Sequence, residues 1–217
     1  WTASYEKAIL TGGGGTVSVR SGAGTIRPYS AQNGSGYFLP SPGAVNSLRT
    51  LLDGTYVETQ PNGFQSRYDS SGRLATMQSV AGRVWTLGYD VSGRVESVLN
   101  PVSGRTSYVY DAAGLIQRTV DPFGRVTTFQ HDANGNLTKR ICAELCETEY
   151  RYDSLSRINA TVDSEGMRTS YAYDSQGRFS SVVAPNGSRT TLQYQSSRTR
   201  VVIDPLSNRT TITLNAN

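Results

Sequence analysis

The sequence predicts an all-β protein in which consecutive β-hairpins form a long, curved antiparallel sheet. Two observations carry this prediction. Tyrosine recurs every 21 residues, usually followed by aspartate, and turn-forming residues separate the short segments in between. In addition, tyrosine (13 residues) outnumbers phenylalanine (5) and tryptophan (2), and 22 glycines are present, which favours short turn-linked strands over a large apolar core.

Two columns of residues define the repeat. The first contains Tyr in six registers and His in one, and the second contains Asp until Gln195 replaces it. The columns are Tyr68, Tyr89, Tyr110, His131, Tyr152, Tyr173 and Tyr194, and Asp69, Asp90, Asp111, Asp132, Asp153 and Asp174. Because self-similarity at a fixed period decides an architecture, we expect one structural unit for each 21 residues.

Each unit contains two predicted strands. The first begins six residues after Tyr, with Leu74, Val95, Ile116, Leu137, Ile158 and Phe179, and has a further apolar column ten residues after Tyr. In these six registers the position seven residues after Tyr is polar except in the first, where it is Ala75, so apolar and polar positions alternate as they do in a strand with one buried face. The second strand ends at Tyr, with a large side chain two residues earlier, such as Leu87 or Tyr171.

Two turn signals separate the strands. One is D-x-x-G, in which Asp bonds the downstream backbone and Gly takes a positive φ. The other is D-P-x-G-R, clearest at residues 121–125 and echoed at Asn100-Pro101, Gln60-Pro61, Ala184-Pro185 and Asp204-Pro205. Proline cannot occupy a central strand, so these positions mark the ends of strands. Each unit is therefore predicted to be one β-hairpin.

The column eight residues after Tyr has the same parity as the apolar columns. It contains Thr76, Ser97, Arg118, Lys139, Ala160 and Ser181. We therefore expect Tyr and these columns to lie on the same, inner face of the sheet. This face should be apolar at its edges and polar in the middle. Such a face fits a broad sheet that curves around a wet or occupied space. A single hairpin is marginal in water, whereas stacked copies bury their common face.

We predict two regions along the chain. Residues 1–55 contain Gly-rich, degenerate repeats with a strand-and-turn rhythm but without the Tyr-Asp columns, and residues 56–217 contain the repeat array, in about seven registers.

The Y-D-x-x-G-R and D-P-x-G-R columns closely resemble the YD repeats of the Rhs family. This family includes bacterial Rhs and wall-associated polymorphic toxins, the C component of insecticidal Tc toxins, and the teneurin adhesion receptors. The resemblance implies a long ribbon of hairpins that walls in a hollow shell, which in the toxins holds a sequestered toxic domain. Seven registers are too few to close such a shell, so we expect a fragment, a processed product, or a short member that assembles with copies of itself.

The family's self-cleavage motif is not carried over to this chain. In Rhs toxins a D-P-x-G-L core motif follows the repeats and supplies the aspartates for cleavage. The nearest string here runs from Asp204 to Asn208, and it has Ser207 and Asn208 where Gly and Leu should stand.

Charge does not indicate a nucleic-acid partner. The net charge is +4, but the Arg residues recur singly at turns and do not form the clustered patch that binds phosphates. We interpret them as solvated turn charges. No segment reaches the roughly 18 uninterrupted apolar residues of a membrane-spanning helix.

No catalytic, cofactor-binding or metal site is predicted. His131 is the only histidine and stands in the Tyr column, so we interpret it as one ring replacing another. The Gly12–Gly15 run lacks the Lys-Ser/Thr and helix that follow a phosphate-binding loop, and we interpret it as a flexible loop.

The two cysteines replace the ends of one D-P-x-G-R turn. Cys142 and Cys146 occupy the positions of Asp121 and Arg125 one period later. Residues that flank a hairpin turn face each other at the Cβ separation of a disulfide, so we favour a disulfide and an oxidising compartment. The alternative, a zinc site, has only these two thiol ligands.

The sequence therefore favours a non-enzymatic wall segment of a secreted or cell-surface protein of this family. Its expected partners are other segments of the same shell, copies of itself, and an enclosed toxin. A second hypothesis is a fibre subunit or adhesion module, because exposed strand edges can pair with another chain. A third is a glycan-binding surface, for which the tyrosines and Trp85 would supply stacking surfaces.

Overall fold

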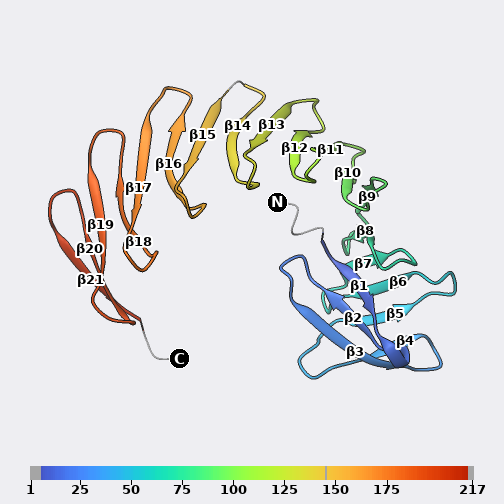
Figure 1. The fold of residues 1–217 in the computed structure, drawn as a ribbon. Coiled ribbons are helices and arrows are strands. Elements are labelled where there is room, and N and C mark those ends of the chain that lie inside the picture. Colours follow the sequence, from blue (N-terminus) through green and yellow to red (C-terminus); the bar gives the residue numbers. More distant parts are fainter. Residues whose placement is uncertain (1–5, 145, 215–217) are drawn as a thin grey trace. The chain divides into compact units, whose positions relative to one another are not determined.

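The computed structural model describes residues 6–144 and 146–214 and confirms an all-β fold of consecutive antiparallel hairpins (Figure 1). The strands are β1 (Ala8–Thr11), β2 (Val17–Arg20), β3 (Ile26–Gln32), β4 (Tyr37–Pro40), β5 (Ser47–Thr50), β6 (Tyr56–Thr59), β7 (Gln65–Tyr68), β8 (Leu74–Gln78), β9 (Val84–Tyr89), β10 (Val95–Leu99), β11 (Arg105–Tyr110), β12 (Ile116–Val120), β13 (Val126–His131), β14 (Leu137–Ile141), β15 (Glu147–Tyr152), β16 (Ile158–Asp163), β17 (Arg168–Tyr173), β18 (Phe179–Val183), β19 (Arg189–Tyr194), β20 (Thr199–Ile203) and β21 (Arg209–Thr213). A 3-10 turn, η2 (Gly13–Gly15), joins β1 to β2.

The chain forms two compact units. The N-terminal unit comprises Trp1–Val109 and Val120–Gly124, and the C-terminal unit comprises Tyr110–Thr119 and Arg125–Asn217. Within the N-terminal unit, β1 to β11 pair in chain order. Within the C-terminal unit, β13 to β21 do the same. The predicted boundary between residues 55 and 56 concerns the quality of the repeat and stays a prediction.

The sheet of the N-terminal unit turns back on itself. The Ile9 N–H in β1 donates to the Gly72 carbonyl at 2.7 Å, and Ala8 forms a bridge with Arg73. A Cβ atom on Gly72 would clash with the Ile9 carbonyl oxygen, so this approach requires glycine. The first strand therefore lies against the turn between β7 and β8.

This return encloses a hydrophobic core. Its buried members come from strands that are far apart in sequence: Ile9, Val17, Val19, Tyr29, Phe38, Leu48, Tyr68, Leu74, Leu87, Val95 and Val98. Met77 and Trp85 pack against this cluster while remaining partly exposed. The degenerate repeats and the first regular repeats therefore share one core.

The C-terminal unit is a curved ribbon of hairpins, in which β13 to β21 follow one another (yellow to red in Figure 1). Of its described residues, only Ala160, Ser181 and Val201 are buried, and each lies near the middle of a strand. Most other strand residues are half-buried. This unit is therefore held together mainly by contacts between neighbouring hairpins.

Both kinds of turn close in the same way. In the Asp174 turn, the Asp174 N–H donates to Arg178 O at 2.8 Å and the Gly177 N–H to Asp174 O at 2.9 Å. The turn from Ala184 to Ser188 repeats both bonds at 2.9 Å. The fourth residue takes a positive φ, which Gly adopts without strain.

A β-bulge at the Tyr column changes the predicted faces. At Tyr173 the register shifts, so that Ala172 pairs with Ser181 while Tyr173 pairs with Phe179. The same shift occurs at Tyr68, Tyr89, His131 and Tyr152 but not at Tyr194.

The expectation that Tyr shares a face with the columns eight and ten residues later was wrong. Tyr171 pairs with Val182, nine residues after Tyr173, whereas Val183 pairs with Ser170. Directly paired residues project to the same side of a sheet. The large side chain two residues before Tyr therefore projects from one face of the sheet, and the residue ten after Tyr projects from the other face. The extra residue of the bulge stands seven residues after Tyr. It moves the residues that follow it to the face opposite to the one that simple alternation predicts.

Candidate functional site

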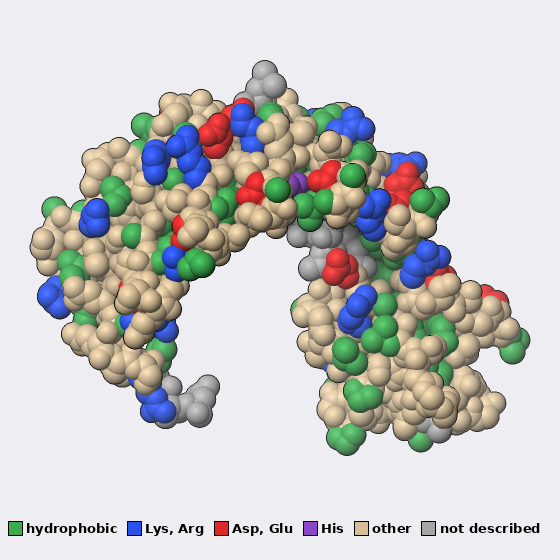
Figure 2. All heavy atoms as spheres, in the orientation of Figure 1, with side chains coloured by type: hydrophobic (Ala, Val, Ile, Leu, Met, Phe, Trp, Pro, Cys, Tyr) green, Lys and Arg blue, Asp and Glu red, His purple; other side chains and the backbone are tan. Residues whose placement is uncertain are grey.

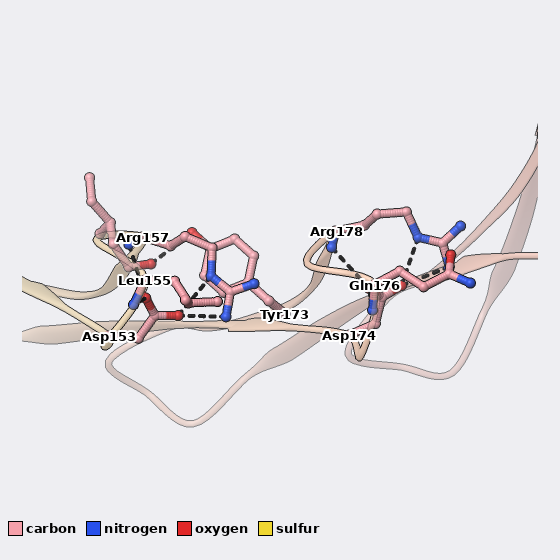
Figure 3. Close-up of polar contacts among 8 residues, drawn as sticks. Asp153, Leu155, Arg157, Tyr173, Asp174, Gln176 and Arg178 are labelled. Carbon is pink, nitrogen blue, oxygen red and sulfur yellow. Dashed lines mark hydrogen bonds and ion pairs between the residues drawn. The ribbon is translucent and has the colours of Figure 1, made fainter.

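The Tyr-Asp turn is a compact hydrogen-bonded unit (Figure 3). In the turn that begins at Asp153, the Oδ1 atom accepts the backbone N–H of Leu155 at 2.9 Å and that of Arg157 at 3.0 Å. The Oδ2 atom accepts the Arg157 Nε–H at 2.7 Å. One carboxylate therefore fixes both the backbone of the turn and the direction of the arginine.

The same unit recurs in other turns that follow the Tyr column. The Asp-Arg ion pairs are Asp69–Arg73, Asp90–Arg94, Asp153–Arg157 and Asp174–Arg178. In the turn that begins at Asp132, Asn136 replaces the arginine and its Nδ2 donates to Asp132 Oδ2 at 2.9 Å. The turn from Asp204 to Asn208 is built in the same way, with 2.8 Å for this bond.

These contacts stabilise the ionised carboxylates. The Arg157 side chain and backbone lower the pKa of Asp153, and Arg178 acts in the same way on Asp174. For Asp90, the backbone N–H of Arg94 is the main cause of the lowered pKa, followed by the Arg94 side chain. Hydrogen bonds to the charged form of a carboxyl group favour that form.

The arginine also contacts the next repeat. The Arg157 guanidinium lies over the ring of Tyr173, 4.4 Å from its centroid, and Arg178 lies over Tyr194 at 4.0 Å. In the N-terminal unit, Arg73 lies over Tyr89 at 5.1 Å. A guanidinium at these distances is attracted to the ring face. We call the Asp and Arg of one turn, with the Tyr of the next repeat, the Asp–Arg–Tyr clamp.

The Tyr hydroxyl completes the link between repeats. Tyr173 donates to the Ile158 carbonyl at 2.8 Å, and Tyr152 donates to Leu137 at the same distance. Tyr89 donates to Leu74 at 2.6 Å, and burial, with the Asp69 charge, raises the pKa of Tyr89 to about 12. Each acceptor is the first residue of a strand in the preceding repeat: Leu74 begins β8, Leu137 begins β14 and Ile158 begins β16. The Tyr column therefore joins consecutive hairpins.

The arginines are thus not simply solvated turn charges, as the sequence suggested. Each paired arginine contacts a carboxylate, and Arg73, Arg157 and Arg178 also contact an aromatic ring. On the face drawn in Figure 2, Lys and Arg occur singly or in small groups among acidic and neutral side chains.

His131 occupies the Tyr column at the end of β13, as predicted from the period. Its Nδ1 lies 3.8 Å from Asp111 Oδ2, and its side chain is mostly buried. The turn of Asp111 has Leu115 at the position where the other turns of the Asp column have arginine or, in the Asp132 turn, asparagine. The imidazole therefore faces Asp111, and Asp111 is the one member of the Asp column whose turn has an apolar residue at the arginine position.

The Gly12–Gly15 run and the two cysteines each form part of a turn between strands. Gly13–Gly15 form η2, and the Gly12 N–H closes the loop on Thr16 O at 2.8 Å. The structure joins Cys142 to Cys146 by a disulfide, with the Cα atoms 5.2 Å apart, across the turn between β14 and β15. Within residues 6–144 and 146–214, no group of three or more His, Cys, Asp or Glu side chains is placed to hold a metal ion.

A buried polar cluster in the N-terminal unit was not predicted. Glu58, only 3% exposed, accepts from Asn46 Nδ2 at 2.6 Å, Tyr68 OH at 2.8 Å and Lys7 Nζ at 3.1 Å. Burial alone would raise the pKa of Glu58, but Asn46, the Lys7 charge and Tyr68 together lower it. Lys7 also donates to the buried Ser66 hydroxyl at 3.3 Å. No sequence signal marks this cluster, because Lys7 and Glu58 are far apart in the chain and belong to no motif.

The cluster shows how the array begins. Tyr68, the first residue of the Tyr column, donates to Glu58 where later tyrosines donate to the backbone of a preceding repeat. Burial and the Glu58 charge both raise the pKa of Tyr68, which keeps its hydroxyl protonated as a donor. Ser66 and Lys7 do not form a nucleophile and base, because Ser66 is buried and Lys7 is paired with Glu58.

No helix in the described part of the chain is long and apolar enough to cross a bilayer. No curated protein matches the sequence. The chain matches the RHS Repeat family model in three overlapping segments, residues 68–106, 89–122 and 110–144.

Solved structures share the fold. The crystal structure of TcdB2-TccC3-Cdc42 matches with a TM-score of 0.61 and 13% identity, over 93% of this chain and 14% of that chain. The crystal structure of TcdB2-TccC3 without its hypervariable C-terminal region matches with a TM-score of 0.61 and 14% identity, over 93% of this chain and 14% of that chain. The structure of the Photorhabdus luminescens Tc holotoxin pore matches with a TM-score of 0.60 and 13% identity, over 91% of this chain and 14% of that chain. The chain therefore spans a small part of each of these proteins.

The matched residues include the Asp69–Arg73–Tyr89 clamp, and the chain shares the fold of a segment of these larger proteins. The chain therefore contains repeats of the Rhs family, matched over residues 68–144.

Proposed function

We propose that this chain is a non-enzymatic wall segment of a secreted or cell-surface Rhs protein and that the wall encloses a toxin or other cargo. The observation that carries the proposal is the clamp between repeats. Asp, Arg and Tyr, the polar residues that define the repeat, hold neighbouring hairpins together. Side chains used in this way support a continuous sheet and leave the repeat columns without a free nucleophile or base.

The similar structures agree with this role, since each contains TcdB2-TccC3 or the Tc holotoxin. The partners proposed are other segments of the same shell and an enclosed toxin domain. The Cys142–Cys146 disulfide supports an oxidising compartment. Electrospray mass measurement of the chain, unreduced and alkylated, tests this point: two alkylated thiols would contradict it.

Limited proteolysis of the complete gene product tests the wall. If the chain encloses cargo, a segment outside residues 1–217 should resist protease until the wall opens. We expect the double variant Arg157→Ala/Arg178→Ala, which removes two clamps, to expose that segment. The matched control is Arg151→Ala/Arg189→Ala, because these arginines lie in strands and belong to no clamp. Equal digestion of both variants, or no protected segment in the parent, would contradict the proposal.

A self-assembling module is the second candidate, and β21 is the observation that favours it. All five residues of β21 are exposed, and β20 is its only partner strand among the described residues. An open edge of this kind is a template for another strand. Light scattering and electron microscopy test it: the parent should form filaments, and Ile212→Lys, which places a charge on the edge, should not. A monomeric parent would exclude assembly by this edge.

A further inference from the structure

A pocket of about 430 Å³ lies in the N-terminal unit, between corresponding turns of two successive hairpins. We call it the Trp85 pocket. It is lined by Arg83, Trp85, Asn100, Pro101 and Val102. Arg83 ends the turn before β9, and the other turn begins at Asn100, one period after Ser79.

Trp85 departs from the repeat. The residues one to five periods later are all threonine: Thr106, Thr127, Thr148, Thr169 and Thr190. Threonine suits a half-exposed position in a strand, so the sheet itself does not need an indole here. Trp85 packs against the hydrophobic core and also lines the pocket, where it adds an aromatic surface that no later repeat has.

Arg83 differs from the clamp arginines because its turn lacks a carboxylate. Ser79 occupies the first position, and its Oγ accepts only the backbone N–H of Arg83, at 3.2 Å. No ion pair, side-chain hydrogen bond or ring contact engages the Arg83 guanidinium within the described ranges, whereas Arg73 and Arg157 are paired with aspartates. Arg83 therefore brings an uncompensated charge to the rim of the pocket.

Asn100 contributes a donor. Its Oδ1 already accepts the backbone N–H groups of Val102 at 3.0 Å and Gly104 at 2.7 Å, which close the turn. The carboxamide is thereby fixed in orientation, and its Nδ2–H₂ group is the part that can bind a ligand. Pro101 and Val102 supply apolar walls.

We propose that the Trp85 pocket binds an acidic pyranose, the uronic acid unit of a polysaccharide. The indole face attracts the polarised C–H groups of a sugar ring, and the guanidinium of Arg83 binds its carboxylate through two N–H donors. Asn100 Nδ2 donates to a ring hydroxyl. A neutral sugar would leave the charge of Arg83 without a partner, so acidity is the feature that the pocket selects. This site does not depend on the wall role of the chain.

Isothermal titration calorimetry with two oligosaccharides tests the proposal. The probe is a hexasaccharide of alternating glucuronic acid and N-acetylglucosamine, and the neutral comparison is a hexamer of N-acetylglucosamine. We expect the acidic probe to bind roughly tenfold more tightly, because a charge-assisted bidentate contact is lost with the neutral one.

Two variants assign the contacts. Arg83→Gln should abolish the preference for the acidic probe, and Trp85→Thr, which restores the repeat residue, should abolish binding of both. Arg189→Gln, an exposed strand arginine in the C-terminal unit, is the matched control and should bind as the parent does. Circular dichroism checks that each variant is folded.

Three results would overturn the proposal: no saturable binding of the acidic probe, equal affinity for the two probes, or the parent's preference retained in Arg83→Gln. If Trp85→Thr fails to fold, the comparison of probes and the Arg83→Gln variant still decide the outcome.

Discussion

The N-terminal and C-terminal units stabilise similar hairpins in different ways. In the N-terminal unit the sheet returns on itself, and side chains such as Leu48 and Leu74 are fully buried. In the C-terminal unit the described residues include only three that are buried, and clamps such as Asp153–Arg157–Tyr173 join one hairpin to the next. The difference indicates that the hairpin can form part of a closed, cored domain or of an open ribbon, according to what its neighbours provide.

The largest expected effect tests the core of the N-terminal unit. Leu48→Ala should lower the free energy of unfolding by about 4 kcal/mol, since Leu48 is 0% exposed and its truncation leaves a cavity. Leu206→Ala, at an 83% exposed turn position in the C-terminal unit, should change it by less than about 0.5 kcal/mol. Urea denaturation measures both. Similar losses in the two variants would remove the distinction between the units.

The second prediction concerns the buried charge. Glu58→Gln should cost about 3 kcal/mol at neutral pH, because Lys7 is left without its counter-ion. The pKa of Glu58 is lowered in the folded protein, so its contribution is present above the pKa of the unfolded carboxyl group. That contribution disappears as the pH falls through the folded-state pKa. Denaturation at a series of acidic pH values should therefore show a flatter loss of stability in Glu58→Gln, and parallel curves would contradict the assignment.

Alanine substitutions at two glycines with similar φ distinguish the cost of strain in the turn from the cost of displacing β1. Gly72 has φ +82° and Gly187 has φ +83°, so alanine should cost each about 1 kcal/mol. A Cβ on Gly72 also meets the Ile9 carbonyl oxygen, whereas nothing lies within 4 Å of a Cβ on Gly187. Gly72→Ala should therefore lose about 2 kcal/mol in total. Equal losses would mean that β1 does not depend on this approach.

The smallest effect is a gain in the C-terminal unit. Ser156 takes the turn position that glycine occupies elsewhere, with φ 57°. Ser156→Gly should stabilise by up to about 1 kcal/mol by relieving this conformation, and thermal unfolding would show a higher midpoint. Ser154→Gly in the same turn, where φ is not positive, should be neutral or slightly destabilising. A lower midpoint for Ser156→Gly would show that its hydroxyl contact with Asn136 matters more.

The sequence predicted the hairpins and turns well because Asp, Gly and Pro act locally. The Asp69 and Gly72 positions have the bonding and the positive φ that their residue types require. The faces were mispredicted because the bulge at Tyr inserts one residue whose chemistry does not distinguish it from its neighbours, as with Ala75 and Ser180.

The clamp could have been found in part from the sequence. Arg73, Arg157 and Arg178 each stand 16 residues before a Tyr, and this constant spacing is visible once hairpin pairing is assumed. The Glu58 cluster and the Trp85 pocket depend on how strands of the N-terminal unit come together, which no periodic signal encodes.

The clamps also determine how the C-terminal unit should respond to force. Each one takes Asp and Arg from one repeat and Tyr from the next, so its loss frees a single hairpin and leaves the following clamp closed. Stretched from its ends, such a ribbon should yield one repeat at a time, releasing roughly 70 Å of chain at each step. The spacing of the tyrosines is thereby also a mechanical step length.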